Sequence, residues 1–198
     1  IEVLRGPQGL LYGADGGGVV AISTRPATRG LNGQILLEGG SDNFERNSAL
    51  VSGGSDAIRA SASATTVATE GFNSRALDDV SADRDGYNNT TLHTTLEADL
   101  TEQWQIGASA HRVEGDNDYD GCFDNTTFAT IHDCTDDYQQ MAWRTFARWS
   151  SRLMDITASY ENNQIERAFF SAGVESFATD GENEEISLLA NVHLDNDR

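Results

Sequence analysis

Apolar and polar residues alternate along several segments of this chain, and this alternation restricts its possible folds more than any other feature. In residues 90–100, TTLHTTLEADL, apolar or small side chains occupy every second position from Leu92 onward and polar ones lie between them. Residues 104–112, 141–149 and 186–194 repeat the pattern. A period of two is typical of a strand with one apolar and one polar face. The sequence therefore predicts an all-β chain.

We expect about eight antiparallel strands, joined by connections that are alternately tight and long. The predicted strands cover residues 33–40, 45–53, 57–68, 89–100, 103–113, 140–150, 153–165 and 183–194. The tight turns are expected at residues 53–56, 101–103 and 151–152, and the long polar connections at residues 69–88, 115–139 and 166–182.

This order of connections favours a transmembrane β-barrel, with a soluble β-sandwich as the alternative. An outer-membrane barrel places short turns at its periplasmic end and long loops at its extracellular end, with apolar side chains outside and polar ones inside. A sandwich gives the same strands but no reason to gather the long loops at one end. Trp104 and Trp149 flank tight turns, where a barrel has an interfacial aromatic girdle and a sandwich would have core residues.

The charge balance excludes one broad class of function. The chain has 13 basic residues, all of them arginine, against 32 acidic residues, which gives a formal net charge of −19. Nucleic-acid binding requires a basic surface that neutralises phosphates, so we expect no nucleic-acid partner. An acidic surface by itself indicates only good solvation.

The two cysteines, Cys122 and Cys134, lie in a polar segment rich in aspartate. Their spacing favours a disulfide that closes a loop outside the cytosol. A metal site is the alternative, with weaker support because His132 is the one histidine close to them in the sequence.

Residues 1–25, IEVLRGPQGLLYGADGGGVVAISTR, concentrate glycine and proline in a way that the rest of the chain does not repeat. The stretch lacks the G-K-[ST] of a phosphate-binding loop and the spacing of a dinucleotide fingerprint. It resembles the C-terminal end of the plug domain of TonB-dependent outer-membrane receptors. The residues that carry this resemblance are Arg5, Gly6, Pro7, Tyr12, Gly13, Gly17 and Gly18.

The resemblance implies two domains: the end of a plug and a linker at residues 1–30, and the N-terminal part of a barrel at residues 31–198. In this family the barrel has about 22 strands, so the chain is expected to be a fragment. It also implies outer-membrane localisation and contact with outer-membrane lipid. The implied function is active uptake of a large, scarce nutrient, energised by the TonB complex through an N-terminal segment. No Ser-His-Asp or Cys-His arrangement suggests an enzyme.

A finer resemblance lies in residues 71–100 and 117–140, which are similar to extracellular loops of the vitamin B12 (cobalamin) receptors of that family. There, loop aspartates bind calcium, which orders the loops around the corrinoid. Calcium takes six to eight hard oxygen ligands, and residues 115–139 contain seven aspartates. The alternative is that these acidic loops only solvate the surface. By position, the resemblance assigns calcium ligands to Asp83, Asp85, Asp120, Asp133 and Asn73, where Asn73 replaces an aspartate.

Two rival functions remain open at this point. The plug resemblance is shared across the family, so the ligand is alternatively a ferric siderophore, and the loop aspartates alone favour a corrinoid. From another class, the chain is alternatively a non-transporting β-protein whose outer binding surface is braced by calcium. The plug-like stretch argues against that last interpretation.

Overall fold

The computed structural model describes residues 2–5, 18–21, 29–73 and 84–194, and the described residues form three antiparallel sheets. Within them, no helix has the length and apolar character needed to cross a membrane. The strands are β1 (Glu2–Arg5), β2 (Gly18–Ala21), β3 (Gly30–Gly39), β4 (Glu45–Gly54), β5 (Ile58–Phe72), β6 (Asp85–Asp99), β7 (Trp104–Tyr119), β8 (Cys122–Phe123), β9 (Thr130–Ile131), β10 (Cys134–Ser150), β11 (Met154–Ser171) and β12 (Val174–Val192).

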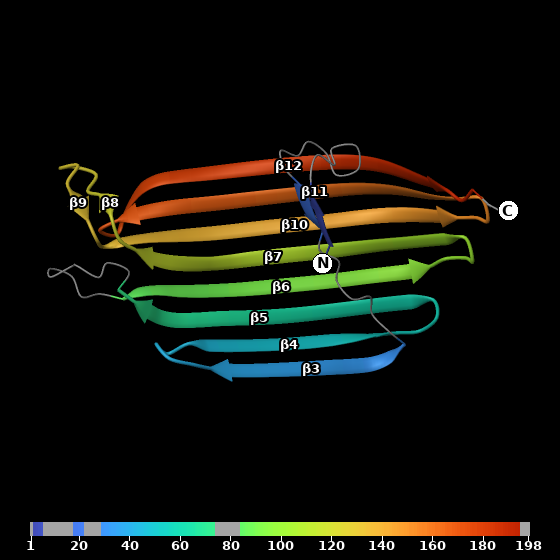
Figure 1. Cartoon of the computed structure of the whole chain (residues 1–198), viewed down its shortest axis with the longest axis horizontal. Coiled ribbons are helices and arrows are strands. Elements are labelled where there is room, and N and C mark those ends of the chain that lie inside the picture. Colours follow the sequence, from blue (N-terminus) through green and yellow to red (C-terminus); the bar gives the residue numbers. More distant parts are fainter. Residues whose placement is uncertain (1, 6–17, 22–28, 74–83, 195–198) are drawn as a thin grey trace.

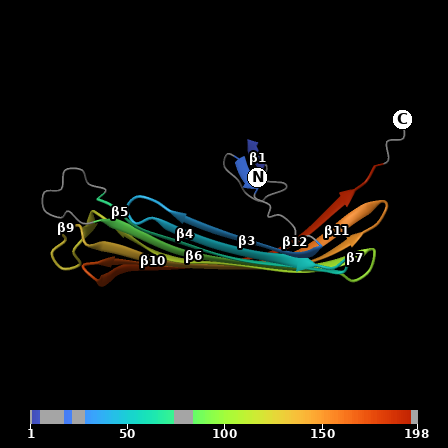
Figure 2. The ribbon, with the colours of Figure 1, turned by 90° about the horizontal axis from the view of Figure 1, so that it is seen from below.

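The main sheet contains eight of the described strands in the order β12-β11-β10-β7-β6-β5-β4-β3. Neighbours in the sheet are consecutive in the chain, except that the short hairpin β8–β9 lies between β7 and β10. Figure 1 shows the eight strands side by side, and Figure 2 shows that the sheet is curved. The predicted all-β class with eight antiparallel strands is confirmed.

Strands β1 and β2 form a separate two-stranded sheet, in which Arg5 lies opposite Gly18. Among the described residues they pair with each other and not with the main sheet. Figure 2 shows them on the concave side of the curved sheet. The other predicted plug residues, Gly6, Pro7, Tyr12, Gly13 and Gly17, lie outside the described residues. The division into plug and barrel at residue 30 stays a prediction.

The long connection predicted at residues 166–182 is wrong. Strands β11 and β12 continue to Ser171 and from Val174, and the turn between them consists of Ala172 and Gly173. Both turn residues have positive φ, 50° and 72°, as a two-residue hairpin of the primed type requires. The remaining two long connections are shorter than predicted, covering residues 73–84 and 120–133.

The prediction failed because polar and apolar side chains occur on both faces of the sheet at this end, where the adjacent Phe169 and Phe170 lie on opposite faces. Polar contacts occur here even on the face that is apolar in the middle of the sheet. On that face Arg112 donates to Glu114 over 2.7 Å, and Gln164 donates to Glu182 over 3.0 Å. Because neither face is consistently apolar or polar here, the period-two signal is lost. The strands therefore continue well past the last residue that the alternation marks.

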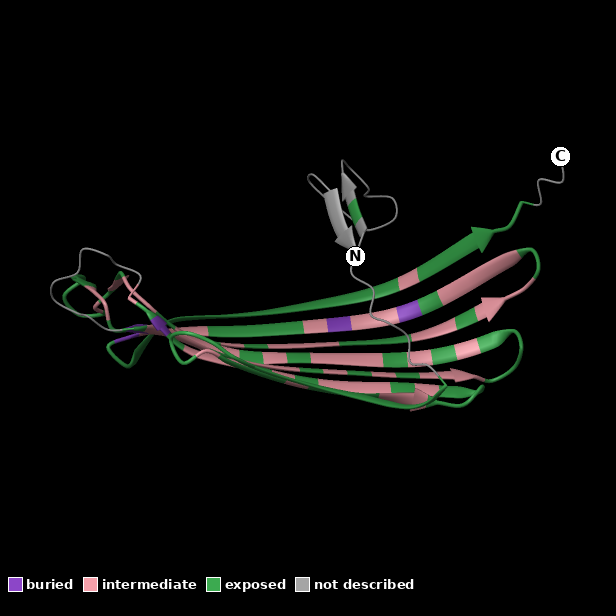
Figure 3. Cartoon of the chain, turned by 60° about the horizontal axis from the view of Figure 1, so that its bottom comes forward, coloured by how far each residue is buried: buried purple, intermediate pink, exposed green. Residues whose placement is uncertain are grey.

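Large apolar side chains are exposed along the middle of the sheet, on its apolar face, and Figure 3 shows that few residues of the main sheet are buried. Leu96 is 52% exposed, and Ala108, which pairs with it, faces the same side. Among the described residues, Cys134 is the single buried apolar residue. The sheet consequently has no core of its own. The exposed large side chains of this face include Leu92, Leu96, Trp104, Ile106, Trp143, Ile186 and Leu188.

Hydrogen bonds and ion pairs between strands cover the opposite, polar face. Arg59 donates to both carboxylate oxygens of Asp99 over 2.7 and 3.0 Å, and its Nε approaches Glu97 at 3.4 Å. Arg144 pairs with Glu161 at 2.8 Å. An exposed apolar face opposite a polar, hydrogen-bonded face is the arrangement of a barrel wall between lipid and an aqueous lumen.

Trp104 and Trp149 are direct register partners on β7 and β10. They lie next to the tight turns 101–103 and 151–153, at the end of the sheet opposite the long connections. Their position is that of an aromatic girdle, where an amphipathic ring meets both hydrocarbon and water.

We predict that an arginine on the apolar face destabilises the folded protein far more than one on the polar face. Leu96→Arg should lower the free energy of unfolding by about 2–4 kcal/mol, the cost of an arginine at the bilayer midplane. Thr91→Arg, on the same strand but the polar face, is the matched control and should cost much less. Unfolding of the full-length protein in lipid vesicles measures both. Equal losses would contradict the assignment of the two faces.

Candidate functional site

Four of the five predicted loop residues are described, and they lie at one end of the sheet, where connections 73–84 and 120–133 emerge (Figure 1). Asn73 follows β5 directly, and Asp85 is the first residue of β6. Asp120 follows β7 and Asp133 precedes β10. Asp83 lies outside the described residues.

Asp118 lies between the two connections and interacts with residues from both. The backbone N–H of Gly86 donates to its carboxylate. Partial burial raises the pKa of Asp118 above its ordinary value, and the like charges of Asp116, Asp85 and Asp133 add to this rise. Two predicted ligands, Asp85 and Asp133, thus act electrostatically on one carboxylate that the sequence reasoning missed. Its place in the run Asp116-x-Asp118-x-Asp120 was the available signal.

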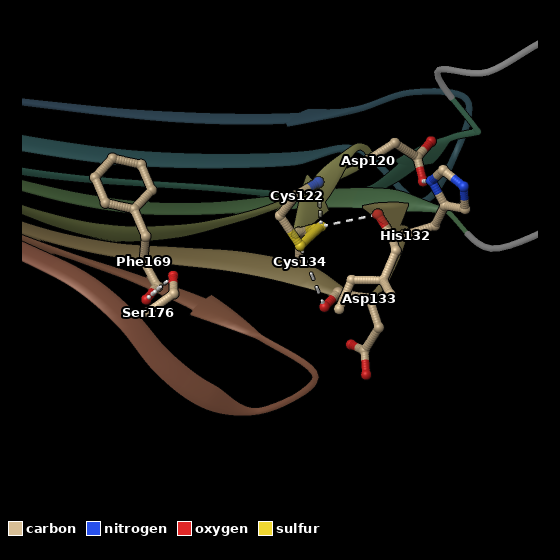
Figure 4. The surroundings of a disulfide bond; sticks show 8 residues. Asp120, Cys122, His132, Asp133, Cys134, Phe169 and Ser176 are labelled. Carbon is tan, nitrogen blue, oxygen red and sulfur yellow. Dashed lines mark hydrogen bonds and ion pairs between the residues drawn. A yellow bond between two sulfur atoms is a disulfide. The ribbon is translucent and has the colours of Figure 1, made fainter. Parts of the chain in front are cut away.

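Asp120 is more buried than the exposed Asp133 and contacts a histidine. Its side chain is 5% exposed, and its Oδ1 lies 3.4 Å from Nδ1 of His132. In Figure 4 the carboxylate of Asp133 points away from this pair. In the described parts of the chain, no group of three or more His, Cys, Asp or Glu side chains is arranged to hold a metal ion. The structure therefore brings Asn73, Asp85, Asp120 and Asp133 to one rim, and the described residues among them do not form a complete metal site.

A disulfide joins Cys122 and Cys134, with an S–S distance of 2.09 Å. This is the pairing that the sequence favours over a metal site. The bond ties the start of β8 to the start of β10, and the N–H of Cys122 donates to Sγ of Cys134 over 3.1 Å (Figure 4). It closes a loop that contains Asp133, and Asp120 lies just before that loop in the chain.

The tip of the same loop is held by Asp124. Its Oδ1 accepts from the backbone N–H groups of Thr126 and Thr127, over 3.0 and 2.6 Å, and from the Thr127 hydroxyl over 2.8 Å. The pKa of Asp124 is lowered, first by the backbone hydrogen bond from Thr127. The hydrogen bonds of its carboxylate thus stabilise the local turn.

Aromatic side chains gather on the polar face at this same end, in a group that sequence reasoning missed. The hydroxyl of Tyr138 lies 3.3 Å from that of Tyr87 and accepts from Asn89 over 2.7 Å. The guanidinium of Arg167 stacks 4.8 Å from the ring centre of Phe169, whose ring centre is 6.1 Å from that of Phe177. We call this group the rim aromatic cluster: Tyr87, Tyr138, Arg167, Phe169 and Phe177.

A buried carboxylate fixes the cluster in place. Asp136 is 3% exposed and accepts from Nε and Nη2 of Arg167, both over 2.8 Å, and from Asn117 over 3.1 Å. A buried charge is stable only when it is paired and hydrogen-bonded in this way. The pairing holds the flat guanidinium and the ring of Phe169 against each other. Phe169 and Phe177 face each other on paired strands. The sequence predicts a loop over residues 166–182 and therefore gives no sign of this pairing.

The rim aromatic cluster, with the neighbouring amides of Asn89 and Asn117, has the chemistry to hold a large amphipathic molecule. Aromatic faces bury apolar surface, while tyrosine hydroxyls and arginine keep polar contacts at the edges.

No protein-family model matches the chain. It is similar to the vitamin B12 transporter BtuB of Vibrio vulnificus, with 30% identity over 139 residues that cover 66% of this chain and 22% of the relative. It is also similar to the vitamin B12 transporter BtuB of Photobacterium profundum, with 27% identity over 125 residues that cover 62% of this chain and 20% of the relative. The chain thus spans about a fifth of the length of these relatives.

Among solved structures, the chain superimposes on the siderophore receptor PiuA from Acinetobacter baumannii with a TM-score of 0.74. The match covers 98% of this chain and 32% of the receptor, at 14% sequence identity. This likeness shows the fold: the curved sheet has the fold of a portion of that receptor's β-barrel.

We predict that removing the disulfide loosens the loop and leaves the sheet intact. A bridge between residues 12 positions apart constrains the unfolded loop by about 3 kcal/mol on the chain-entropy account. In the double variant Cys122→Ser, Cys134→Ser, amides of residues 120–133 should therefore exchange hydrogen faster. Amides of the turn at residues 151–153 serve as the internal control. Unchanged exchange in the loop would show that the bridge does not constrain it.

We also predict that Asp118→Asn stabilises the rim when divalent cations are absent. A carboxyl whose pKa is raised on folding stabilises the folded state below its ordinary pKa, and this contribution is lost as pH rises through the raised value. At pH 7 the ionised Asp118 is therefore unfavourable, and the amide removes its charge while still accepting from Gly86. Melting of the full-length protein in EGTA at pH 7 should shift upward, and Glu102→Gln at the opposite end should not shift it. A lower melting temperature for Asp118→Asn would refute the repulsion.

Proposed function

The chain is a segment of a TonB-dependent receptor of the bacterial outer membrane, and we propose that the complete protein imports a corrinoid such as cobalamin. The two relatives named as vitamin B12 transporters favour this cargo. The named relatives are transporters and a receptor, which accords with a function that involves no covalent chemistry. The rival cargo is a ferric siderophore, to which the name of the structural match points.

The observation that carries the proposal is the rim aromatic cluster on the polar face, at the same end as the two long connections. A ligand at this point contacts side chains of β6, β10, β11 and β12. A corrinoid presents a broad ring with amide side chains, which matches aromatic faces next to hydroxyl, amide and guanidinium groups.

In the transport cycle that we propose, the ligand binds at the extracellular rim and is released toward the periplasm when the TonB complex pulls on the plug. TonB would act through an N-terminal segment, as the family resemblance implies. The polar face of the sheet would line the lumen beside the plug. The step that this chain performs is binding and gating.

Calcium at the rim is part of the same proposal. Asp85 and Asp133 act on Asp118 from the two sides, and the repulsion among these carboxylates favours a bound dication. Calcium accepts six to eight oxygen ligands at about 2.3–2.6 Å, from carboxylates and amide carbonyls. The ligands proposed from the sequence are Asp83, Asp85, Asp120, Asp133 and Asn73, and the position of Asp118 adds it to the set. When bound, the ion would join the two connections and order them around the ligand.

We predict that corrinoid binding depends on calcium and on the rim aspartates. EGTA should weaken cyanocobalamin binding to the full-length protein, and Asp85→Ala or Asp83→Ala should reproduce about a tenfold loss with calcium present, since each removes a charged ligand. Asp56→Ala, in a tight turn at the opposite end, is the matched control and should bind normally. A ferric siderophore is measured beside the corrinoid.

The outcomes separate the parts of the proposal. Equal corrinoid affinity with and without EGTA contradicts the calcium site but is consistent with a corrinoid as the cargo. Tight siderophore binding without corrinoid binding moves the protein to the rival cargo. Corrinoid binding without TonB-dependent uptake by cells that carry the protein supports the non-transporting alternative.

A further inference from the structure

Two histidines face each other in the middle of the polar face, away from the rim. His93 on β6 and His111 on β7 are direct register partners. Their ring centres are 5.9 Å apart, with an angle of 61° between the ring planes. Atom Nε2 of His93 is buried and has no hydrogen-bond partner among the described residues. Buried polar atoms are nearly always satisfied, so this nitrogen calls for a ligand.

The spacing of the rings permits a shared ion. A transition metal bonds imidazole nitrogen at about 2.0–2.1 Å, which places it about 3.2 Å from each ring centre. Two rings can therefore share one ion when their centres are no more than about 6.4 Å apart. The observed separation of 5.9 Å lies inside this limit, so the spacing of the rings is compatible with both binding one metal.

The residues around the two histidines restrict which metals the site can bind. Along the register row, the neighbours of the pair are Ser63 on β5 and Ala142 on β10. The nearest carboxylate on the next row of that face, Glu161, is engaged by Arg144 at 2.8 Å. The site thus offers two imidazoles without charged oxygen ligands. Such a donor set suits copper, nickel and zinc and disfavours calcium and magnesium.

We propose that His93 and His111 together bind one transition-metal dication, of the class of Cu²⁺, Ni²⁺ or Zn²⁺, on the lumen side of the sheet. Water or a group of the cargo completes the coordination. This site differs from the calcium rim in its position, its ligands and its metal. It does not depend on which nutrient the protein imports.

The test uses Cu²⁺ because copper binds nitrogen ligands most tightly in the divalent series. The full-length protein in detergent is titrated with Cu²⁺, and electron paramagnetic resonance counts the coordinating nitrogens. Two imidazole nitrogens are expected in the wild type. His93→Ala and His111→Ala should each weaken binding at least about 10-fold, since loss of even a supporting residue costs about 10- to 100-fold in metal affinity.

His193→Ala is the matched control. His193 lies at the end of the sheet with the tight turns, away from the histidine pair, and contacts Asp155 at 2.9 Å. This variant should leave the two-nitrogen signal unchanged. His93→Asn and His111→Asn repeat the test with smaller changes of shape, and heat-modified migration in gels checks that each barrel has folded. A wild-type spectrum without two nitrogens, or equal affinity in all variants, overturns the proposal.

A second measurement needs no variant. Diethyl pyrocarbonate modifies free imidazoles, and peptide mapping locates the modified residues. Zn²⁺ should protect His93 and His111 together while His193 stays reactive. Equal modification with and without Zn²⁺ would overturn the proposal even if every variant failed to fold.

Discussion

Backbone hydrogen bonds between neighbouring strands hold this protein together, because its described residues contain almost no buried apolar side chains. In most domains the burial of apolar surface drives folding, whereas here the apolar face is offered to lipid. Within a bilayer every backbone polar group needs a partner inside the protein, so the ladder of β3 to β12 is obligatory. The long, in-register pairing of β10 with β7 and β11 is the result.

This ladder positions the functional groups by register rather than by a packed core. A residue on one strand and its partner on the next necessarily share a face. Register therefore sets Tyr87, Asp136 and Phe169 in one row at the rim, and it sets His93 beside His111. The same pairing register places Trp104 beside Trp149 at the end of the sheet with the tight turns. Binding chemistry and membrane anchoring thus follow from one pairing scheme.

The predictions from sequence succeeded where one face is apolar and the other polar, and failed where both faces mix polar and apolar residues. Leu92 to Leu100 alternate because lipid lies on one side, so the central part of β6 was found. Residues 166–182 were interpreted as a loop because no such contrast exists beyond the bilayer, although β11 and β12 pair there to the turn at Ala172 and Gly173. The Cys122–Cys134 pairing followed from residue type and spacing. The crowding around Asp118 and the rim aromatic cluster did not, since both depend on strands distant in sequence.

The sequence by itself determined the all-β class, the number of strands in the main sheet and which side of each central strand meets lipid. These properties are local, because the alternation of side chains along a strand is a consequence of its own backbone geometry. The tertiary structure alone decided which polar residues meet across strands: Asp136 with Arg167, Asp118 with Asp85 and Asp133, and His93 with His111. Such meetings depend on the pairing register, where a shift of a single residue would turn every side chain to the opposite face.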